Sequence, residues 1–306
     1  MNTYDIIIVG AGPAGLTSAI YASRSSKKVL VLEAKSYGGQ IINTLDIENY
    51  PANNHISGFD LATNMYNQAI DLGAEIKFEK VVEIKNKPNH KEVTTTNNKY
   101  KCKALILATG SENRKLNIEN EDNLIGKGIS YCATCDGAFY KGKVVAVVGG
   151  GNSALEDALY LSDIAKKVYL IHRRDTFRGE ETVLNKIKEK ENITIIYNSN
   201  VTKLNASNVL NSIEVTDNTG NKKEIEVSAL FVAVGRVPEN QNFSKIINLD
   251  DKGYIIAKEN CHTNRKGIFV AGDARTKSLR QLVTATSDGA VSATEAIKYI
   301  NSLKSR

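Results

Sequence analysis

The sequence of 306 residues has no tryptophan, two methionines and only four prolines. Long apolar runs are missing too: runs such as residues 6–9 and 144–148 are far shorter than the ~20 residues that cross a bilayer. The first residues show no basic cluster before an apolar stretch, which a secretory signal would need. These absences leave a globular chain of ordinary composition, for which we expect a cytoplasmic location and no membrane partner.

Cysteine and charge are also limited. Cys102, Cys132, Cys135 and Cys261 are too few for the disulfide framework of a secreted protein in a chain of this length. The 40 basic and 34 acidic residues give a net charge of +6 without any block of cations, so we expect no nucleic-acid partner. A chain this long suits two domains of middling size.

A strand, a glycine turn and a helix open the chain. Residues 5–9 form a β-branched apolar run typical of a buried parallel strand, and Gly10-Ala11-Gly12-Pro13-Ala14-Gly15 follows it. In such a turn Gly10 permits the sharp bend, Gly12 lets the backbone approach a pyrophosphate, and Gly15 lets the helix pack closely on the sheet. The pyrophosphate would lie at the helix N-terminus.

The next apolar strand, residues 29–32, ends at Glu33. An acidic residue at this place accepts hydrogen bonds from ribose hydroxyls and selects an adenosine without a 2′-phosphate. FAD and NAD both fit this pattern. A single motif of this kind is also compatible with an ordinary strand-to-helix turn.

The same construction recurs in the middle of the chain. Residues 143–148 form an apolar strand that runs into Gly149-Gly150-Gly151-Asn152-Ser153-Ala154, and a further strand follows at residues 168–171. The spacing from Gly149 to His172 equals the spacing from Gly10 to Glu33. Two copies in the same register indicate two dinucleotide sites.

Cations follow the second strand of this copy, where the first copy has an acid. The order is His172-Arg173-Arg174, with Arg178 close behind. Because guanidinium groups bind phosphate in a bidentate fork, Arg173, Arg174 and Arg178 favour NADP at this site. A solvated helix face is the alternative for the arginines, and His172 is compatible with either cofactor binding or packing.

Two further apolar strands, residues 104–110 and 229–235, end in glycine and are counterparts of each other. They complete the two units and predict an α/β fold with two Rossmann-like three-layer dinucleotide-binding domains, the second inserted into the first. We expect the first domain to comprise residues 1–114 and 246–306, and the second to comprise residues 115–245.

The segment Cys132-Ala133-Thr134-Cys135-Asp136 carries the chemistry. Two cysteines three positions apart on a helical turn bring their Cα atoms about 5 to 6 Å apart, within reach of a disulfide. Asp136 beside them can take or give the proton that thiol and disulfide exchange requires. Half of a zinc site is the alternative, but Cys102 and Cys261 supply no second pair, so we expect no metal. Asp136-Gly137 is also a common turn dipeptide.

Together these segments resemble the low-molecular-weight, bacterial-type thioredoxin reductases over essentially the whole chain. The motifs that carry the resemblance are Gly10-Ala11-Gly12-Pro13-Ala14-Gly15, Gly38-Gly39-Gln40, Glu48-Asn49-Tyr50-Pro51, Cys132-Ala133-Thr134-Cys135-Asp136, Gly149-Gly150-Gly151-Asn152-Ser153-Ala154, His172-Arg173-Arg174 with Arg178, and Gly272-Asp273 with Arg280-Gln281. The cysteine segment is the most specific of them, because in the related glutathione-reductase group the redox pair lies in the first domain.

The resemblance implies a thioredoxin-disulfide reductase with an FAD-binding first domain and an NADPH-binding second domain. Hydride would pass from NADPH to FAD, then to the Cys132–Cys135 disulfide and then to thioredoxin, with Cys132 attacking the partner and Cys135 facing the flavin. It also implies a homodimer, and a rotation of the NADPH domain about segments near residues 112–117 and 242–247. A related reductase serving another carrier protein and an FAD-binding redox sensor are the alternatives, and the arginines argue against a ferredoxin-dependent relative.

The resemblance also assigns cofactor contacts. Asp273 would bind the ribityl or phosphate region of FAD, and the helix that begins after Gln281 would point its positive end at the isoalloxazine ring. In the FAD domain the expected residues are Gly10, Gly12, Pro13, Ala14, Gly15, Glu33, Ala34, Gly38, Gly39, Gln40, Asn49, Ala108, Thr109, Gly110, Gly272, Asp273, Arg280, Gln281 and Leu282. In the NADPH domain they are Gly149, Gly151, Asn152, Ser153, His172, Arg173, Arg174, Arg178 and Gly235.

Overall fold

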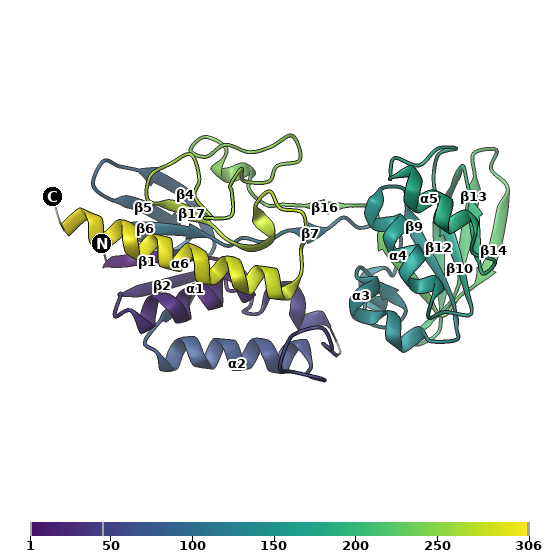
Figure 1. The fold of residues 1–306 in the computed structure, drawn as a ribbon, viewed down its shortest axis with the longest axis horizontal. Helices are drawn as coiled ribbons and strands as arrows, with labels where there is room; N and C mark the ends of the chain where they lie inside the picture. The colour runs from purple at the N-terminus through teal and green to yellow at the C-terminus, as the bar shows by residue number, and fades with distance from the viewer. Residues whose placement is uncertain (1, 45, 305–306) are drawn as a thin grey trace. The chain divides into compact units, whose positions relative to one another are not determined.

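The computed structural model describes residues 2–44 and 46–304 and divides the chain into two compact units (Figure 1). We call Met1–Ile42, Asn49–Glu112 and Val237–Arg306 the outer unit, and Asn43–Glu48 with Asn113–Arg236 the inner unit. The inner unit is thus an insertion in the outer one. No helix within the described ranges is long and apolar enough to cross a membrane.

The chain returns to the outer unit at Val237, before the expected boundary at residue 245. The reason is Asn240, whose side chain is fully buried in the outer unit. Its amide nitrogen donates to the carbonyl oxygens of Gly253 at 3.0 Å and Ala274 at 2.9 Å. Because a buried side-chain amide must keep its hydrogen-bond partners, Asn240 holds the segment that follows Val237 in the outer unit.

A mixed sheet forms the centre of the outer unit. Its parallel part runs in the order β3, β2, β1, β6, with β17 beside the C-terminal half of β6, while β5 and β4 continue antiparallel from the N-terminal half of β6. The strands are β1 (Asn2–Val9), β2 (Val29–Glu33), β3 (Glu75–Phe78), β4 (Val81–Asn86), β5 (Lys91–Thr95), β6 (Lys99–Leu107) and β17 (Ile268–Val270).

Helices α1 (Pro13–Arg24), α2 (Gly58–Asp71) and α6 (Leu282–Lys304) lie along the parallel part of this sheet (Figure 1). Small residues let α1 and α6 cross closely: a Cβ on Gly289 would lie 2.5 Å from the Ala14 carbonyl oxygen. The buried Ser18 hydroxyl bonds the Gly289 carbonyl at 3.1 Å across the same crossing. Short 3₁₀ turns complete the unit: η1 (Gly39–Asn43), η4 (Gln241–Phe243) and η5 (Gly272–Ala274).

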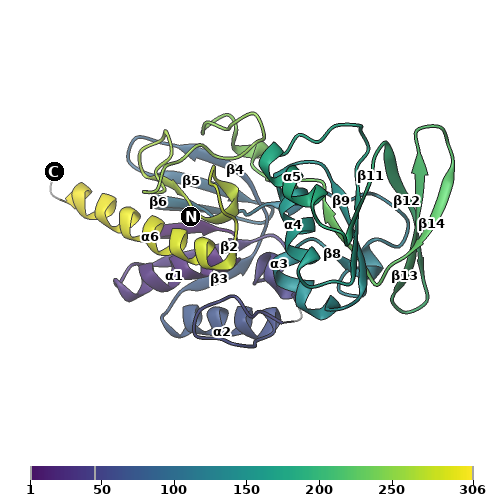
Figure 2. The same cartoon turned by 45° about the vertical axis from the view of Figure 1, so that its right-hand side comes forward.

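The inner unit has a fully parallel sheet in the order β11, β10, β9, β15, β8. Figure 2 labels β8, β9 and β11 of this sheet. Successive residues of β9 alternate between two cores, as expected for a pleated strand. Val145 and Val147 pack toward the helices, and Ala146 and Val148 pack toward an antiparallel three-stranded layer. The sheet strands are β8 (Ile129–Ser130), β9 (Val144–Gly149), β10 (Lys167–Ile171), β11 (Ile193–Ile196) and β15 (Ala229–Ala233). The covering elements are β12 (Ser199–Ala206), β13 (Leu210–Asp217), β14 (Lys222–Glu226), η2 (Asp122–Leu124), α3 (Ala133–Asp136), η3 (Gly137–Tyr140), α4 (Asn152–Ser162) and α5 (Glu181–Lys188).

The two units repeat one construction, as the sequence predicts. In the outer unit β1 pairs with β2 and β6, and in the inner unit β9 pairs with β10 and β15. A Cβ on Gly10 would collide with the Ala108 carbonyl oxygen, and a Cβ on Gly149 would collide with that of Ala233. Gly10 therefore lies against the residue directly after β6, and Gly149 lies against the last residue of β15. Strands β7 (Glu112–Asn113) and β16 (Arg236–Val237), where the chain passes between the units, pair with each other.

Candidate active site

A disulfide joins Cys132 and Cys135, with an S–S distance of 2.09 Å and a Cα–Cα distance of 5.3 Å. Cys132 caps the single helical turn α3, and its carbonyl accepts the amides of Cys135 at 3.3 Å and Asp136 at 3.1 Å. The predicted pairing on a helical turn is confirmed. Cys102 and Cys261 are buried free thiols, and burial raises the pKa of each to about 12, so both stay protonated at neutral pH.

Asp136 lies directly after the disulfide, with its carboxyl group mostly withdrawn from water. Burial raises the pKa of Asp136, and a hydrogen bond from Ser130 opposes that rise. The Ser130 hydroxyl donates to Oδ2 of Asp136 at 2.6 Å and accepts the Cys132 amide at 3.1 Å. A carboxyl group with a raised pKa can hold a proton nearer to neutral pH than an exposed aspartate can.

The first glycine turn is built as the sequence predicts. Gly12 precedes α1, no side chain caps the helix, and a Cβ on Gly12 would have only the Gly39 Cα near it, at 3.9 Å. A Cβ on Gly15 would collide with the Gly10 carbonyl oxygen. Glu33 braces this turn, because its carboxylate accepts the Ala11 amide at 2.7 Å. Its other oxygen accepts the Lys35 amide at 2.9 Å, and each oxygen keeps a further acceptor site.

Segments far apart in the sequence meet at this turn. The Gly38 amide donates to the Ala11 carbonyl at 2.8 Å, and Gly38 and Gly39 have φ values of 95° and 58°, which favour glycine. A Cβ on Gly272 would lie 2.8 Å from that of Ala14, so the Gly272-Asp273 turn rests on the start of α1. The structure therefore brings the predicted residues 10–15, 38–40 and 272–273 together.

Asn49 and Gln281 also meet: the Asn49 amide donates to Oε1 of Gln281 at 3.3 Å, next to the first residue of α6, Leu282. The Arg280 guanidinium lies 4.0 Å from the ring centroid of Tyr254. Its Nη2 donates to the Arg275 carbonyl at 3.2 Å. The helix begins after Gln281 as predicted.

The second glycine turn differs from the first in its surroundings. Nothing described lies within 4 Å of a Cβ placed on Gly151, and no side chain caps α4. The Arg178 amide donates to the Gly150 carbonyl at 2.8 Å, which brings the arginine segment to the turn. Arg173, Arg174 and Arg178 are exposed, and none forms an ion pair within residues 2–44 and 46–304.

Two other predicted residues of this site have structural partners. Asn152 accepts the Glu180 amide at 2.8 Å and donates to its carboxylate at 3.2 Å, so it holds the end of the arginine segment. The His172 ring is buried, lies against Gly150 and stacks on Phe177 with centroids 4.7 Å apart. His172 thus packs against this turn, and its contact with the cofactor stays a prediction.

Comparisons with known proteins agree over almost the entire chain. The model of the pyridine nucleotide-disulphide oxidoreductase family matches residues 4–289. The thioredoxin reductase of Listeria monocytogenes is 42% identical over 303 residues, covering 98% of this chain and 95% of that protein. The crystal structure of the Streptococcus pyogenes thioredoxin reductase is similar with a TM-score of 0.92 and 37% identity, covering 98% of this chain and 99% of that one.

The chain belongs to the low-molecular-weight thioredoxin reductases. A second relative, the thioredoxin reductase of Bacillus subtilis, is 39% identical over 98% of this chain and 96% of its own length. In this thioredoxin reductase the Cys132–Cys135 disulfide is the redox centre. The family implies FAD and a nicotinamide dinucleotide as cofactors.

Sequence reasoning missed a buried ionic group in the outer unit of this thioredoxin reductase. Asp288 accepts two hydrogen bonds from Arg275, at 2.8 and 2.7 Å, and one from Lys277 at 2.8 Å. It also accepts the Gly272 amide at 3.0 Å. Asp288 therefore fixes the turn that presents Asp273. The signal in the sequence is an aspartate next to Gly289 in a segment rich in small residues, 285–293.

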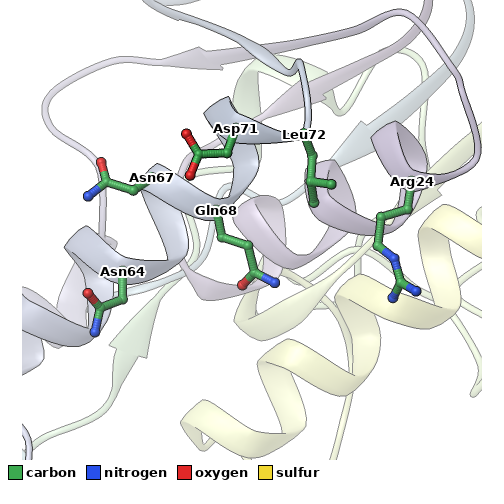
Figure 3. Close-up of a pocket in the computed structure, with 6 residues that line it drawn as sticks. All are labelled: Arg24, Asn64, Asn67, Gln68, Asp71 and Leu72. Atoms are coloured by element: carbon green, nitrogen blue, oxygen red, sulfur yellow. The ribbon is translucent and has the colours of Figure 1, made fainter.

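A cavity of about 460 Å³ between α1 and α2 is not part of this site (Figure 3). Arg24, the last residue of α1, lines it at the end of this helix opposite the glycine turn. Its other lining residues belong to α2 or directly follow it: Asn64, Asn67, Gln68, Asp71 and Leu72.

Proposed function

We propose that this chain passes electrons from NADPH through bound FAD to the Cys132–Cys135 disulfide, and from the resulting dithiol to the disulfide of oxidised thioredoxin. The observation that carries the proposal is the closed disulfide on a one-turn helix, beside the half-buried carboxyl group of Asp136. The names of the relatives support thioredoxin as the protein substrate.

The outer unit fits FAD. Uncapped amides at the start of α1, with glycine at positions 12 and 39, let a pyrophosphate reach the backbone. Glu33 keeps acceptor sites for ribose hydroxyls, and Asp273 follows the turn that Asp288 fixes. Arg280 adds a buried Nε that has no hydrogen-bond partner in the described part of the chain. When bound, FAD would supply the two-electron carrier between nicotinamide and disulfide.

The inner unit fits NADPH better than NADH. Gly151 leaves room for the pyrophosphate at the start of α4. Arg173, Arg174 and Arg178 present exposed guanidinium groups beside the same turn, which suits a 2′-phosphate. Asn152 supports this arrangement through Glu180.

The protein part of the reaction is a pair of exchanges between sulfur atoms. The Cys132 thiolate attacks one sulfur of the partner disulfide, forming a mixed disulfide, and the other partner sulfur leaves with the electron pair and takes a proton. The Cys135 thiolate then attacks Cys132, which restores the Cys132–Cys135 bond and releases the second partner sulfur as a thiol. The dithiol loses two electrons and two protons, and the partner gains both. Asp136 gives or takes these protons.

We also propose that the chain forms homodimers, which sedimentation equilibrium of the purified protein would test. The reductase activity is tested by anaerobic addition of NADPH, which should bleach the flavin absorbance, followed by oxidised thioredoxin, which should restore it. Bleaching that only a glutaredoxin-like carrier reverses would overturn thioredoxin as substrate. A flavin that NADPH leaves oxidised would overturn the electron path.

A further inference from the structure

Ser130 links the redox disulfide to the carboxyl group that serves it. It is the last residue of β8, where it pairs with Phe231 of β15, and its side chain is buried. Its hydroxyl lies 2.6 Å from Oδ2 of Asp136, 3.1 Å from the Cys132 amide nitrogen and 3.3 Å from the Cys132 carbonyl oxygen. Three polar groups of the redox segment therefore converge on one hydroxyl.

A hydroxyl has a single proton to donate and two lone pairs to accept with. While Asp136 is ionised, the proton belongs on the short contact to Oδ2, because a bond to a charged acceptor is the stronger one. When Asp136 is protonated, its own O–H can donate to the Ser130 oxygen, and the Ser130 proton can turn to the Cys132 carbonyl. In both states the Cys132 amide keeps its acceptor.

We infer that Ser130 is a positioning residue that supports Asp136 in both of its protonation states while it holds the backbone of Cys132. The inference rests on the proposed proton role of Asp136. In alanine a methyl group replaces the hydroxymethyl group of serine, so Ser130→Ala would leave the half-buried Asp136 without this donor. The ionised form of Asp136 would be destabilised more than the neutral form.

The neighbours of Asp136 contribute few other charges. Burial raises the pKa of the Tyr140 phenol on η3, and the charge of the nearby Asp136 raises it further. The Lys143 ammonium lies 5.5 Å from the Tyr140 ring centroid. From α4, the Tyr160 ring packs against Gly137. The disulfide sulfurs precede Asp136 in the same turn. The hydrogen bond from Ser130 lowers the pKa of Asp136, whereas burial raises it. Removing the Ser130 hydroxyl should therefore raise the pKa of Asp136.

The test is the titration of Asp136 in the reduced holoprotein, followed by carboxyl carbon NMR with Asp136→Asn used for assignment. In Ser130→Ala we expect the midpoint to rise by roughly 0.5 to 1 pH unit, the effect of one lost hydrogen bond. Ser130→Thr keeps a hydroxyl and should restore the wild-type midpoint. Ser162→Ala is the matched control, since Ser162 is a buried serine of the same unit whose hydroxyl donates to the Leu159 carbonyl.

Turnover with thioredoxin on the same preparations separates the two proposals. A wild-type protein that does not reduce thioredoxin would defeat the proposed function, whatever the titrations show. A wild-type protein that does reduce it, together with an unshifted or lowered midpoint in Ser130→Ala, would overturn the role of Ser130. Should Ser130→Ala fail to fold, the pair Ser130→Thr and Ser130→Val, equal in shape and different in the hydroxyl, gives the same comparison.

Discussion

The carboxylate of Glu121 accepts a hydrogen bond of 2.7 Å from the hydroxyl of Tyr131, the residue directly before Cys132. The same buried carboxylate accepts the backbone amides of Leu116 at 2.9 Å and Asn117 at 2.8 Å, near the start of the inner unit. The Glu121 side chain thus holds both the segment at residues 116–117 and the residue that follows β8. Burial and then Glu121 raise the pKa of the Tyr131 phenol, so it stays a donor at neutral pH.

Glu121→Ala should lower the free energy of unfolding by about 2 to 4 kcal/mol, because it leaves two backbone amides and a phenol without the carboxylate that accepts their hydrogen bonds. Tyr131→Phe removes one of the three bonds and should cost about 1 kcal/mol. Thermal unfolding monitored by circular dichroism measures both. A Glu121→Ala variant as stable as the wild type would show that the hydrogen bonds to Glu121 contribute nothing to the free energy of unfolding.

Cys135→Ser should keep the reduction of flavin by NADPH and lose the delivery of electrons to protein disulfides, because the sulfur bridge can no longer form. Stopped-flow absorbance of the flavin and steady-state reduction of thioredoxin measure the two halves. The matched control is Cys102→Ala, which changes a buried thiol of the outer unit with a pKa of about 12. Thioredoxin reduction that survives in Cys135→Ser would place the electron path elsewhere.

The double variant Arg173→Ala with Arg174→Ala should raise the KM for NADPH by about 10- to 100-fold, the effect of losing charged hydrogen bonds to the 2′-phosphate. The KM for NADH should change little. Lys186→Ala with Lys188→Ala removes the same charge from exposed positions of α5 and controls for general electrostatics. Equal losses with both nucleotides would contradict the assignment.

Asp288→Asn should cost about 3 to 5 kcal/mol of stability at neutral pH, because Arg275 and Lys277 would remain buried without their counterion. Burial by itself raises the pKa of Asp288, but hydrogen bonds from Arg275 and Lys277 hold it below the usual aspartate range. A carboxyl group with a depressed folded pKa stabilises the fold above its unfolded pKa of ~3.9, and this stability is lost as the pH falls through the folded value.

Thermal unfolding from pH 7 down to pH 3 therefore distinguishes the two proteins. The difference in the free energy of unfolding between the wild type and Asp288→Asn should be largest at neutral pH and should become smaller in acid. Glu295→Gln alters a carboxylate on the same helix that pairs with His262 and Lys298 at the surface, and it should cost less than about 1 kcal/mol. A gap that stays constant with pH would rule out the ionic role.

The repeated strand, turn and helix could be predicted because their signals are local. Glycine spacing, an apolar run and a charged strand end lie within about one supersecondary unit, so both dinucleotide units and their insertion follow from the sequence. The disulfide could be predicted for the same reason, since a separation of three positions on a helical turn already sets the distance between the two Cα atoms. The structure confirms both.

The buried polar partners could not be predicted. Asn240 bonds carbonyls at Gly253 and Ala274, and Asp288 bonds the amide of Gly272, all through contacts that only the folded chain creates. In the sequence these side chains look the same as exposed ones. Because the burial of Asn240 cannot be read from the sequence, we expected the second boundary at residue 245, whereas the structure divides the chain beside Val237. Ser130 was overlooked because a serine before a cysteine motif carries no spacing rule.

The pairing of β7 with β16 has a consequence for how such a chain can be rearranged. The chain leaves the outer unit through β7 and returns to it through β16. Because these two strands pair with each other, the two points between which residues 113–236 are inserted already lie side by side. A short turn in place of the insertion would close the outer unit without stretching its sheet. The segment between β7 and β16 could in this sense be exchanged for another domain while the sheet of the outer unit stays as it is.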